Sequence, residues 1–172
     1  ALSMEGGGGF EIWQFTSRQT EKPSFHVQAG DFGLYICKMK SRNVAESLNF
    51  FKENGAEILG DLFKLPNGQH TFFAKDPNGN VFQIVEGRGY FRSTGHSSKC
   101  GGVAGSIIGV SDIDKSLVLY KEILGYNHVE YDVTGVFDDL NELPGGSGKF
   151  RRVLLTHSTE RKGPFARLLG PT

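Results

Sequence analysis

The chain of 172 residues carries 19 basic residues (Lys and Arg) and 19 acidic residues (Asp and Glu), so its formal net charge at pH 7 is zero. This length is sufficient for one ordinary domain or two small ones. Because no net charge attracts phosphates or anionic lipids, we expect no nucleic-acid partner. The longest uncharged apolar runs, such as 103–110, fall well short of the roughly 18 residues of a spanning helix, so we expect no membrane partner either.

Glycine and phenylalanine are unusually frequent. The 24 Gly and 14 Phe residues, beside a single Trp, favour short aromatic-rich strands joined by tight turns. The two cysteines, Cys37 and Cys100, fit neither a zinc motif nor a redox pair. We therefore predict a β-rich fold and, by default, a reducing cytoplasmic location.

The first predicted element is a strand at 10–15, entered from four consecutive glycines. With the apolar run at 1–4 it is typical of a hairpin whose first strand begins before residue 1. A lone hairpin is not stable in water, so we expect another part of the protein to pack beside it. The polar stretch that follows predicts a linker.

From residue 33 the pattern predicts a β-α-β-β-β unit. A strand at 33–40 precedes a helix at 44–54, for which Asn43 is the expected N-cap and Gly55 the stop. Alternating apolar residues then predict three strands, separated by turns rich in Pro, Asn and Gly. These strands are expected at 57–64, 71–75 and 81–86.

The same order of elements then recurs. Ser116 stands 69 residues after Ser47 in a similar local sequence, DIDKS against NVAES. A strand at 103–110, a helix from Asp112 through Leu124, and strands at 127–133 and 151–156 are predicted. Such self-similarity indicates a duplicated supersecondary unit.

Two motifs carry a resemblance to a known superfamily. They are VSDIDKSL at 110–117, continued by YKEILGY at 120–126, and KDPNGNVFQIVE at 75–86. The chain resembles the vicinal oxygen chelate superfamily, also called the glyoxalase, bleomycin-resistance and extradiol-dioxygenase superfamily. The run PFARLLG at 164–170 resembles the approach to a last strand that would follow it.

The resemblance implies an α+β fold of tandem βαβββ modules that form half-open mixed sheets. Both ends of the chain are then expected to be cut relative to the family. The implied division is 1–18 for the last two strands of a truncated first module, 19–32 for a linker, 33–87 for a complete second module, 88–102 for a linker, and 103–172 for a third module lacking its last strand.

The resemblance also implies candidate metal ligands, because the family's first and last strands supply His, Glu or Gln to a divalent ion. Glu11 lies at a last-strand ligand position and is also the candidate catalytic group that moves a proton. Gln83 holds the same position in the next module, although an amide is a weaker ligand than a carboxylate. Ile36 and Gly105, at the first-strand positions, have no side-chain donor. The expected cofactor is a divalent ion such as Fe, Mn, Ni or Zn.

Each candidate residue has a plainer interpretation. Glu11 fits a charge at a strand edge, and Gln83 fits a hydrogen bond within the sheet. Trp13 is expected to line the substrate cavity or the adjoining core, and Ile36 the cavity wall. His70, at the start of a strand, is a weak acid–base candidate that would face the cavity.

Two functions from different classes follow. The first is a divalent-metal-dependent lyase, isomerase or dioxygenase acting on a small substrate with vicinal oxygens. The second is a metal-free small-molecule binding or sequestering protein of the bleomycin-resistance type. A degenerate structural module of a larger chain is a third possibility. Because exposed sheet edges need partners, we expect a homodimer or pairing with modules outside this sequence.

Overall fold

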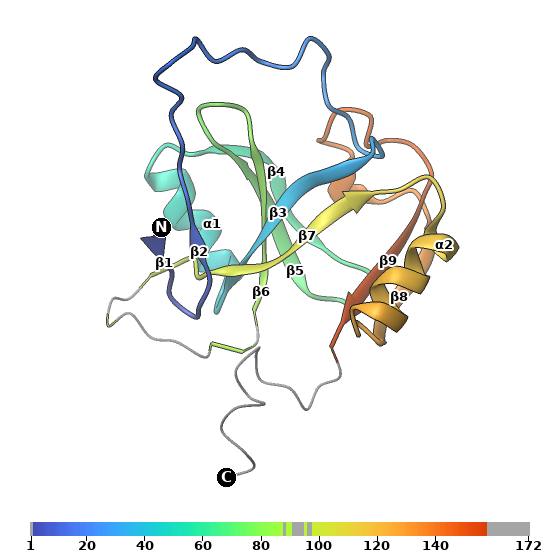
Figure 1. Ribbon diagram of the computed structural model, residues 1–172. Coiled ribbons are helices and arrows are strands. Elements are labelled where there is room, and N and C mark those ends of the chain that lie inside the picture. Colours follow the sequence, from blue (N-terminus) through green and yellow to red (C-terminus); the bar gives the residue numbers. More distant parts are fainter. Residues whose placement is uncertain (1, 88, 91–94, 96–97, 158–172) are drawn as a thin grey trace.

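The computed structural model describes residues 2–87, 89–90, 95 and 98–157. Their elements follow in chain order (Figure 1): β1 (Leu2–Ser3), β2 (Gly9–Phe10), β3 (Gly33–Ser41), α1 (Val44–Glu53), β4 (Glu57–Lys64), β5 (His70–Lys75), β6 (Val81–Glu86), β7 (Val103–Gly109), α2 (Ile113–Leu117), the π-helix η1 (Val118–Ile123), β8 (His128–Gly135), the 3-10 helix η2 (Asp138–Leu140) and β9 (Phe150–Thr156). The expected run at 164–170 lies outside the described residues.

The main feature is a five-stranded mixed sheet with the strand order β4-β5-β6-β3-β7. β3 is parallel to β6, and the other neighbours are antiparallel. β3, α1, β4, β5 and β6 therefore form a β-α-β-β-β unit in one sheet, to which β7 adds along β3. The predicted α+β fold with a mixed sheet is confirmed. No helix in the described ranges is long and apolar enough to cross a bilayer.

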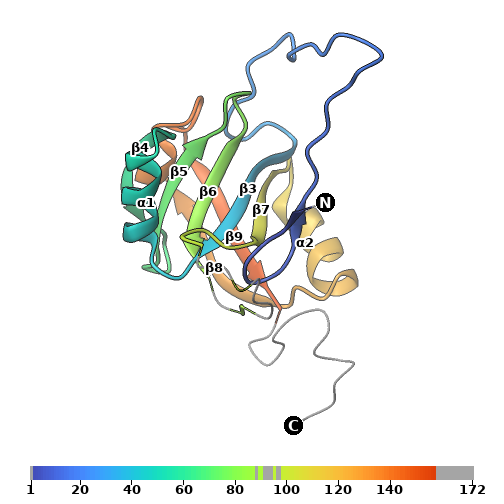
Figure 2. The same ribbon diagram turned by 90° about the vertical axis from the view of Figure 1, so that its left-hand side faces the viewer.

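One face of the sheet is covered by α1 (Figure 2). Asn43 caps this helix as predicted, accepting a hydrogen bond from the backbone N–H of Glu46 at 3.2 Å. Val44 and Leu48 of the helix pack against Phe72 and Ile84 of the sheet. Apolar residues one helical turn apart thus meet alternate residues of the strands, as the sequence periodicity predicts.

The opposite face is covered by the segment that joins β8 to β9. Phe137, Leu140 and Leu143 from this segment pack against Ile36 and Phe73. β8 and β9 form a separate antiparallel hairpin. The sheet is therefore buried on both faces, which explains why successive residues of β5 are buried instead of every second one.

The second predicted helix is split. It begins with the expected Asp112 cap, which accepts from the Lys115 N–H at 3.1 Å, and continues from α2 into the wider turns of η1. Neither segment has a fully buried residue, whereas α1 buries Val44, Ser47 and Leu48. The difference has a cause in the packing: α1 lies over β6, and no described strand takes the corresponding place beneath α2, between β7 and β9.

The first predicted strand is shorter than expected. β2 contains only Gly9–Phe10, paired with β1, and residues 11–15 are irregular. Ile12 and Trp13 are 85% and 81% exposed. Residues 11–15 have strand-forming side chains, but no described strand pairs with them, and propensity without a partner does not produce a strand.

Candidate ligand-binding site

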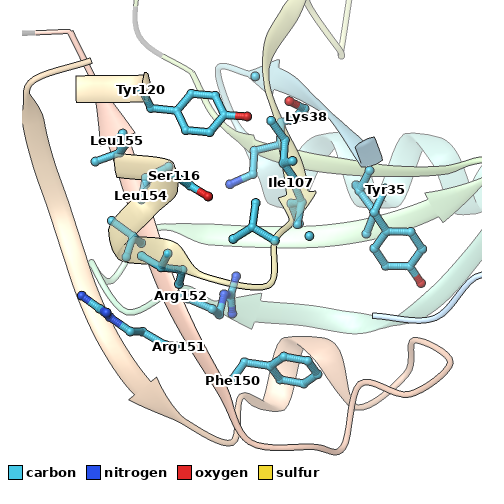
Figure 3. Close-up of a pocket in the computed structure, with 18 of the residues that line it drawn as sticks. Tyr35, Lys38, Ile107, Ser116, Tyr120, Phe150, Arg151, Arg152, Leu154 and Leu155 are labelled. Atoms are coloured by element: carbon cyan, nitrogen blue, oxygen red, sulfur yellow. The ribbon is translucent and has the colours of Figure 1, made fainter. Parts of the chain in front are cut away.

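A cavity of about 530 Å³ lies between β7, the α2–η1 helix and the β8–β9 hairpin (Figure 3). Cavities of this size hold small organic molecules. Most of the wall is apolar, with Ile36, Ile107 and Leu154 among its residues. Tyr131 and three cations, Lys38, Arg151 and Arg152, also line it. An apolar cavity with a few converging polar groups is the usual form of a small-molecule site.

The cavity follows the edges of two strands. Every residue from 104 to 110 and from 150 to 156 lines it. A sheet face would contribute only alternate residues, so the cavity runs along the strand edges of β7 and β9. Each of these strands pairs on one side only within the described sheets. The wall therefore includes backbone groups that are available to a ligand.

Arg151 holds the helix over this cavity. Its guanidinium donates to both carboxylate oxygens of Asp114 in α2, at 3.0 and 3.1 Å. The same group donates to both oxygens of Asp132 in β8, each at 2.9 Å. One side chain of β9 thus ties the helix and the hairpin together by a branched set of charged hydrogen bonds.

A buried ion pair lies at the end of the cavity that contains Lys38 and Arg152, which we call its polar end. Arg152 Nη1 donates a 2.7 Å hydrogen bond to Asp139 Oδ1. Their side chains are only 12% and 2% exposed. The guanidinium also lies 4.6 Å from the ring centre of Phe137, which gives it an aromatic surface in place of water. Tyr131 is close to both charges, and burial raises the pKa of its hydroxyl.

Lys38 is the second buried cation, with 8% of its surface exposed. Burial lowers the pKa of its amine to about 8; the positive charge of Arg152 lowers it further, and Asp139 acts in the opposite direction. In the described part of the chain the amine makes no hydrogen bond or salt bridge. Lys40, two residues along β3, donates instead to the carbonyl oxygens of Gly6 at 2.8 Å and Gly89 at 3.1 Å.

Polar atoms without a described partner lie on the face of the sheet that carries Lys38. Gln83 is fully buried, yet both of its amide atoms lack a hydrogen-bond partner among the described residues. It lies beside Lys38 in the register of β3 and β6. Asp139 Oδ2 also lacks a described partner. Such atoms cost stability, and a bound polar molecule is one way to satisfy them.

Two of the residues predicted for the site lie at or beside this cavity. Ile36 lines it, and Gln83 is buried next to the lining residue Lys38. His70 is on the other face of the sheet, with its Nδ1 3.3 Å from Glu86 Oε1.

The other two predicted residues, Glu11 and Trp13, are exposed and away from the lining of the cavity. The Trp13 indole N–H donates to Glu11 Oε2 at 3.1 Å.

The proposed metal ligands do not fit a common site. Phe10, which precedes Glu11, packs its ring against Phe82 at 5.9 Å. Since neighbouring strand residues point to opposite faces, this contact lies on the face away from Gln83. Within the described ranges no three His, Cys, Asp or Glu side chains form a group able to hold a metal. The described donor side chains therefore do not build the expected divalent-ion site.

Sequence reasoning missed Lys38, Asp139 and Arg152. One signal for Lys38 was present, because a lysine at the centre of a strand buried on both faces is rarely solvated. Asp139 carried no such signal, since it lies in a polar, glycine-rich stretch that is typical of an exposed loop. Arg152 directly follows Arg151, and two adjacent arginines at the start of a strand resemble ordinary solvated charges.

The chain was compared with known proteins. No family model matches it, and no curated protein matches it. A mutant glyoxalase I from Zea mays is similar in structure, with a TM-score of 0.42 and 16% sequence identity over 74% of this chain and 44% of the maize chain. The chain thus spans less than half of that protein. A likeness at this level carries no argument about function.

Proposed function

We propose that this protein binds a small organic anion in the cavity between β7, α2 and the β8–β9 hairpin. The observation that best supports this proposal is the excess of positive charge at the polar end of the cavity. Lys38 and Arg152 are both largely buried there, and among the described residues Asp139 is the carboxylate that interacts with them. A ligand carboxylate would neutralise the remaining charge in a place that water reaches poorly.

The form of the cavity supports the same function. The apolar walls suit the body of a small organic molecule, and Lys38 and Arg152 suit its anionic head. Gln83, the register partner of Lys38 in β6, and Asp139 provide amide and carboxylate atoms with no described partner. A ligand with both acceptor and donor groups would satisfy them.

This activity corresponds to the metal-free binding proteins of the glyoxalase and bleomycin-resistance superfamily. The motifs at 75–86 and 110–126 support membership, as do the β-α-β-β-β order of β3 to β6 and the partial recurrence of that order from β7 onward. Membership stays a proposal, as does a cytoplasmic location. The metal-dependent enzyme of the same superfamily is the weaker alternative, because Glu11 and Gln83 do not build a ligand set.

Isothermal titration of the full chain with benzoate and phenylacetate tests the proposal, with benzamide and phenylacetamide as uncharged counterparts. We expect the acids to bind and the amides to bind at least tenfold more weakly. Lys38→Met is expected to reduce binding of the acids by a similar factor, corresponding to about 1.4 kcal/mol. Lys52→Met is the matched control, because Lys52 is exposed and pairs with Asp61 at 3.1 Å.

Two results would contradict the proposal. One is equal affinity for the acids and their amides, which would remove the role of the cations. The other is an identical loss of binding in the Lys38 and Lys52 variants, which would place the acids at the surface. Thermal unfolding of each variant shows whether the fold is retained.

A further inference from the structure

We propose that Lys38 forms an imine with the carbonyl carbon of a small 2-oxo acid held in this cavity. The inference rests on the proposed anion site and names its ligand class and a covalent step. It assigns to the protein a carbonyl-condensing lysine.

The position of the amine carries the first part of the argument. Lys38 extends from a central strand into the cavity wall, and its amine has no hydrogen bond or salt bridge to any described residue. Lys40 shares the strand and the sheet face, but two backbone carbonyls hold its amine. One buried amine is thus available to a ligand, and its neighbour is occupied.

The protonation state supports nucleophilic attack. Only the neutral amine has a lone pair for a carbonyl carbon, and an exposed lysine is almost fully protonated near neutral pH. Burial and the nearby Arg152 lower the pKa of Lys38 to about 8, so a substantial fraction is neutral in mildly basic solution. Desolvated lysines beside another cation are activated for imine formation in this way.

Charge balance selects an oxo acid over a simple aldehyde. After condensation the protonated imine carries one positive charge and Arg152 carries another. Asp139 and the ligand carboxylate supply two negative charges, so the buried group becomes neutral overall. A simple aldehyde would leave one buried positive charge without compensation.

The step is balanced without an oxidant or reductant. The amine nitrogen bonds to the carbonyl carbon, and the carbonyl π electrons move to oxygen, which gains a proton. The nitrogen gives up one proton, and the hydroxyl group of the resulting carbinolamine takes up a second proton and leaves as water. A protonated carbon–nitrogen double bond remains. We assign the proton transfers to Tyr131, which lines the same cavity and whose hydroxyl keeps its proton because burial raises its pKa.

Reductive trapping tests the inference. The full chain is incubated with pyruvate or phenylpyruvate and sodium cyanoborohydride, which reduces an imine to a stable secondary amine. Intact mass spectrometry and peptide mapping then locate the adduct. We expect one adduct, on Lys38, forming at least tenfold faster than on any other lysine, with a rate that rises towards pH 8.

Two variants provide the controls. Lys38→Arg is expected to abolish the fast adduct while it keeps a positive charge at the site. Lys40→Arg, the matched control on the same strand, is expected to keep it. Labelling spread evenly over the surface lysines would overturn the inference, as would fast labelling that persists in Lys38→Arg.

The test also separates this inference from the proposed function. If benzoate and pyruvate bind in titrations but no adduct forms on Lys38, the imine is wrong and the anion site stands. If neither acid binds and no adduct forms, the anion site is wrong as well. Circular dichroism of both variants shows that a lost adduct does not result from unfolding.

Discussion

Arg152 donates a 2.7 Å hydrogen bond to Asp139 Oδ1, and this contact ties the β8–β9 hairpin to the segment that covers the sheet. Because the carboxylate is 2% exposed, water compensates little of its charge. Breaking a buried pair by removing one member leaves the other charge without compensation. Removal of the whole pair is much less costly than removal of one member.

We therefore expect Arg152→Met to lower the free energy of unfolding by about 3–5 kcal/mol, and Arg152→Met combined with Asp139→Leu to recover most of that loss. Urea denaturation followed by circular dichroism measures both. Lys52→Met, which breaks the exposed pair with Asp61, is expected to change stability by less than about 1 kcal/mol. A double variant as unstable as the single one would show that Arg152 acts through packing and not through charge.

Substitution of Gln83 is expected to stabilise the protein, whereas substitution of Arg152 is expected to destabilise it. Its two amide atoms are buried without described partners, so Gln83→Met removes a desolvation cost and keeps a similar volume. We expect the free energy of unfolding to rise by about 1–3 kcal/mol. Thr71→Val is the matched control, since the Thr71 hydroxyl donates to the Ile84 carbonyl at 2.8 Å and its loss destabilises by about 1 kcal/mol.

The same Gln83 variant separates stability from binding. If these amide atoms contact the ligand, affinity for benzoate falls while the protein without ligand becomes more stable. A decrease in stability would mean that the amide has partners outside the described residues, such as bound water.

The sequence predicted most of the fold, because its signals were local. Asn43 and Asp112 mark helix starts through side-chain caps, and both caps are present. Alternation predicted β3 to β9 to within about two residues at each end. The strand at 10–15 and the second helix were less accurate, because their form depends on a neighbouring strand that local patterns do not reveal.

The candidate site was less predictable. Gln83 and Ile36 were found at or beside the cavity, since position in a strand decides which face a residue occupies. The Asp139–Arg152 pair was missed because it joins the short helix η2 to the strand β9. Such pairs depend on tertiary packing, which neither composition nor periodicity encodes.

The resemblance implies that Glu11 is a metal ligand, and the metal content of the protein tests this role directly. Because Glu11 is exposed and its carboxylate accepts a hydrogen bond from Trp13, we expect Glu11→Ala to bind as much Mn, Fe, Ni or Zn as the unchanged protein. Inductively coupled plasma mass spectrometry after equilibration with each ion measures this. A near-stoichiometric metal that is lost only in the variant would restore the metalloenzyme interpretation.

The expected dimer remains a prediction with a structural basis. Phe32 and Leu34 are each 78% exposed at the start of β3, and apolar surface of this kind is a common site of association. We expect sedimentation velocity to show a dimer that the Phe32→Glu, Leu34→Glu variant weakens at least tenfold. A monomer at all concentrations would contradict the prediction. A dimer that the variant leaves unchanged would indicate that the interface lies elsewhere, for instance at the β7 or β9 edge.

Lys38 makes the stability of the protein depend on pH in a defined direction. Its pKa is about 8 in the folded protein and near 10.5 in the unfolded chain, so between these values the unfolded state binds more protons. Stability therefore rises with pH in this window, because deprotonation relieves the cost of a buried charge. Below about pH 8 both states carry the proton and the contribution is constant.

The difference in unfolding free energy between the unchanged protein and Lys38→Met isolates this effect, because other titrations largely cancel. We expect the difference to shift in favour of the unchanged protein by on the order of 3 kcal/mol from pH 7.5 to pH 10.5. Urea denaturation at each pH measures it, with the exposed Lys52→Met variant as the control that shows no such shift. Parallel curves for all three proteins would mean that the Lys38 amine is solvated, and both the anion site and the imine would then lose their physical basis.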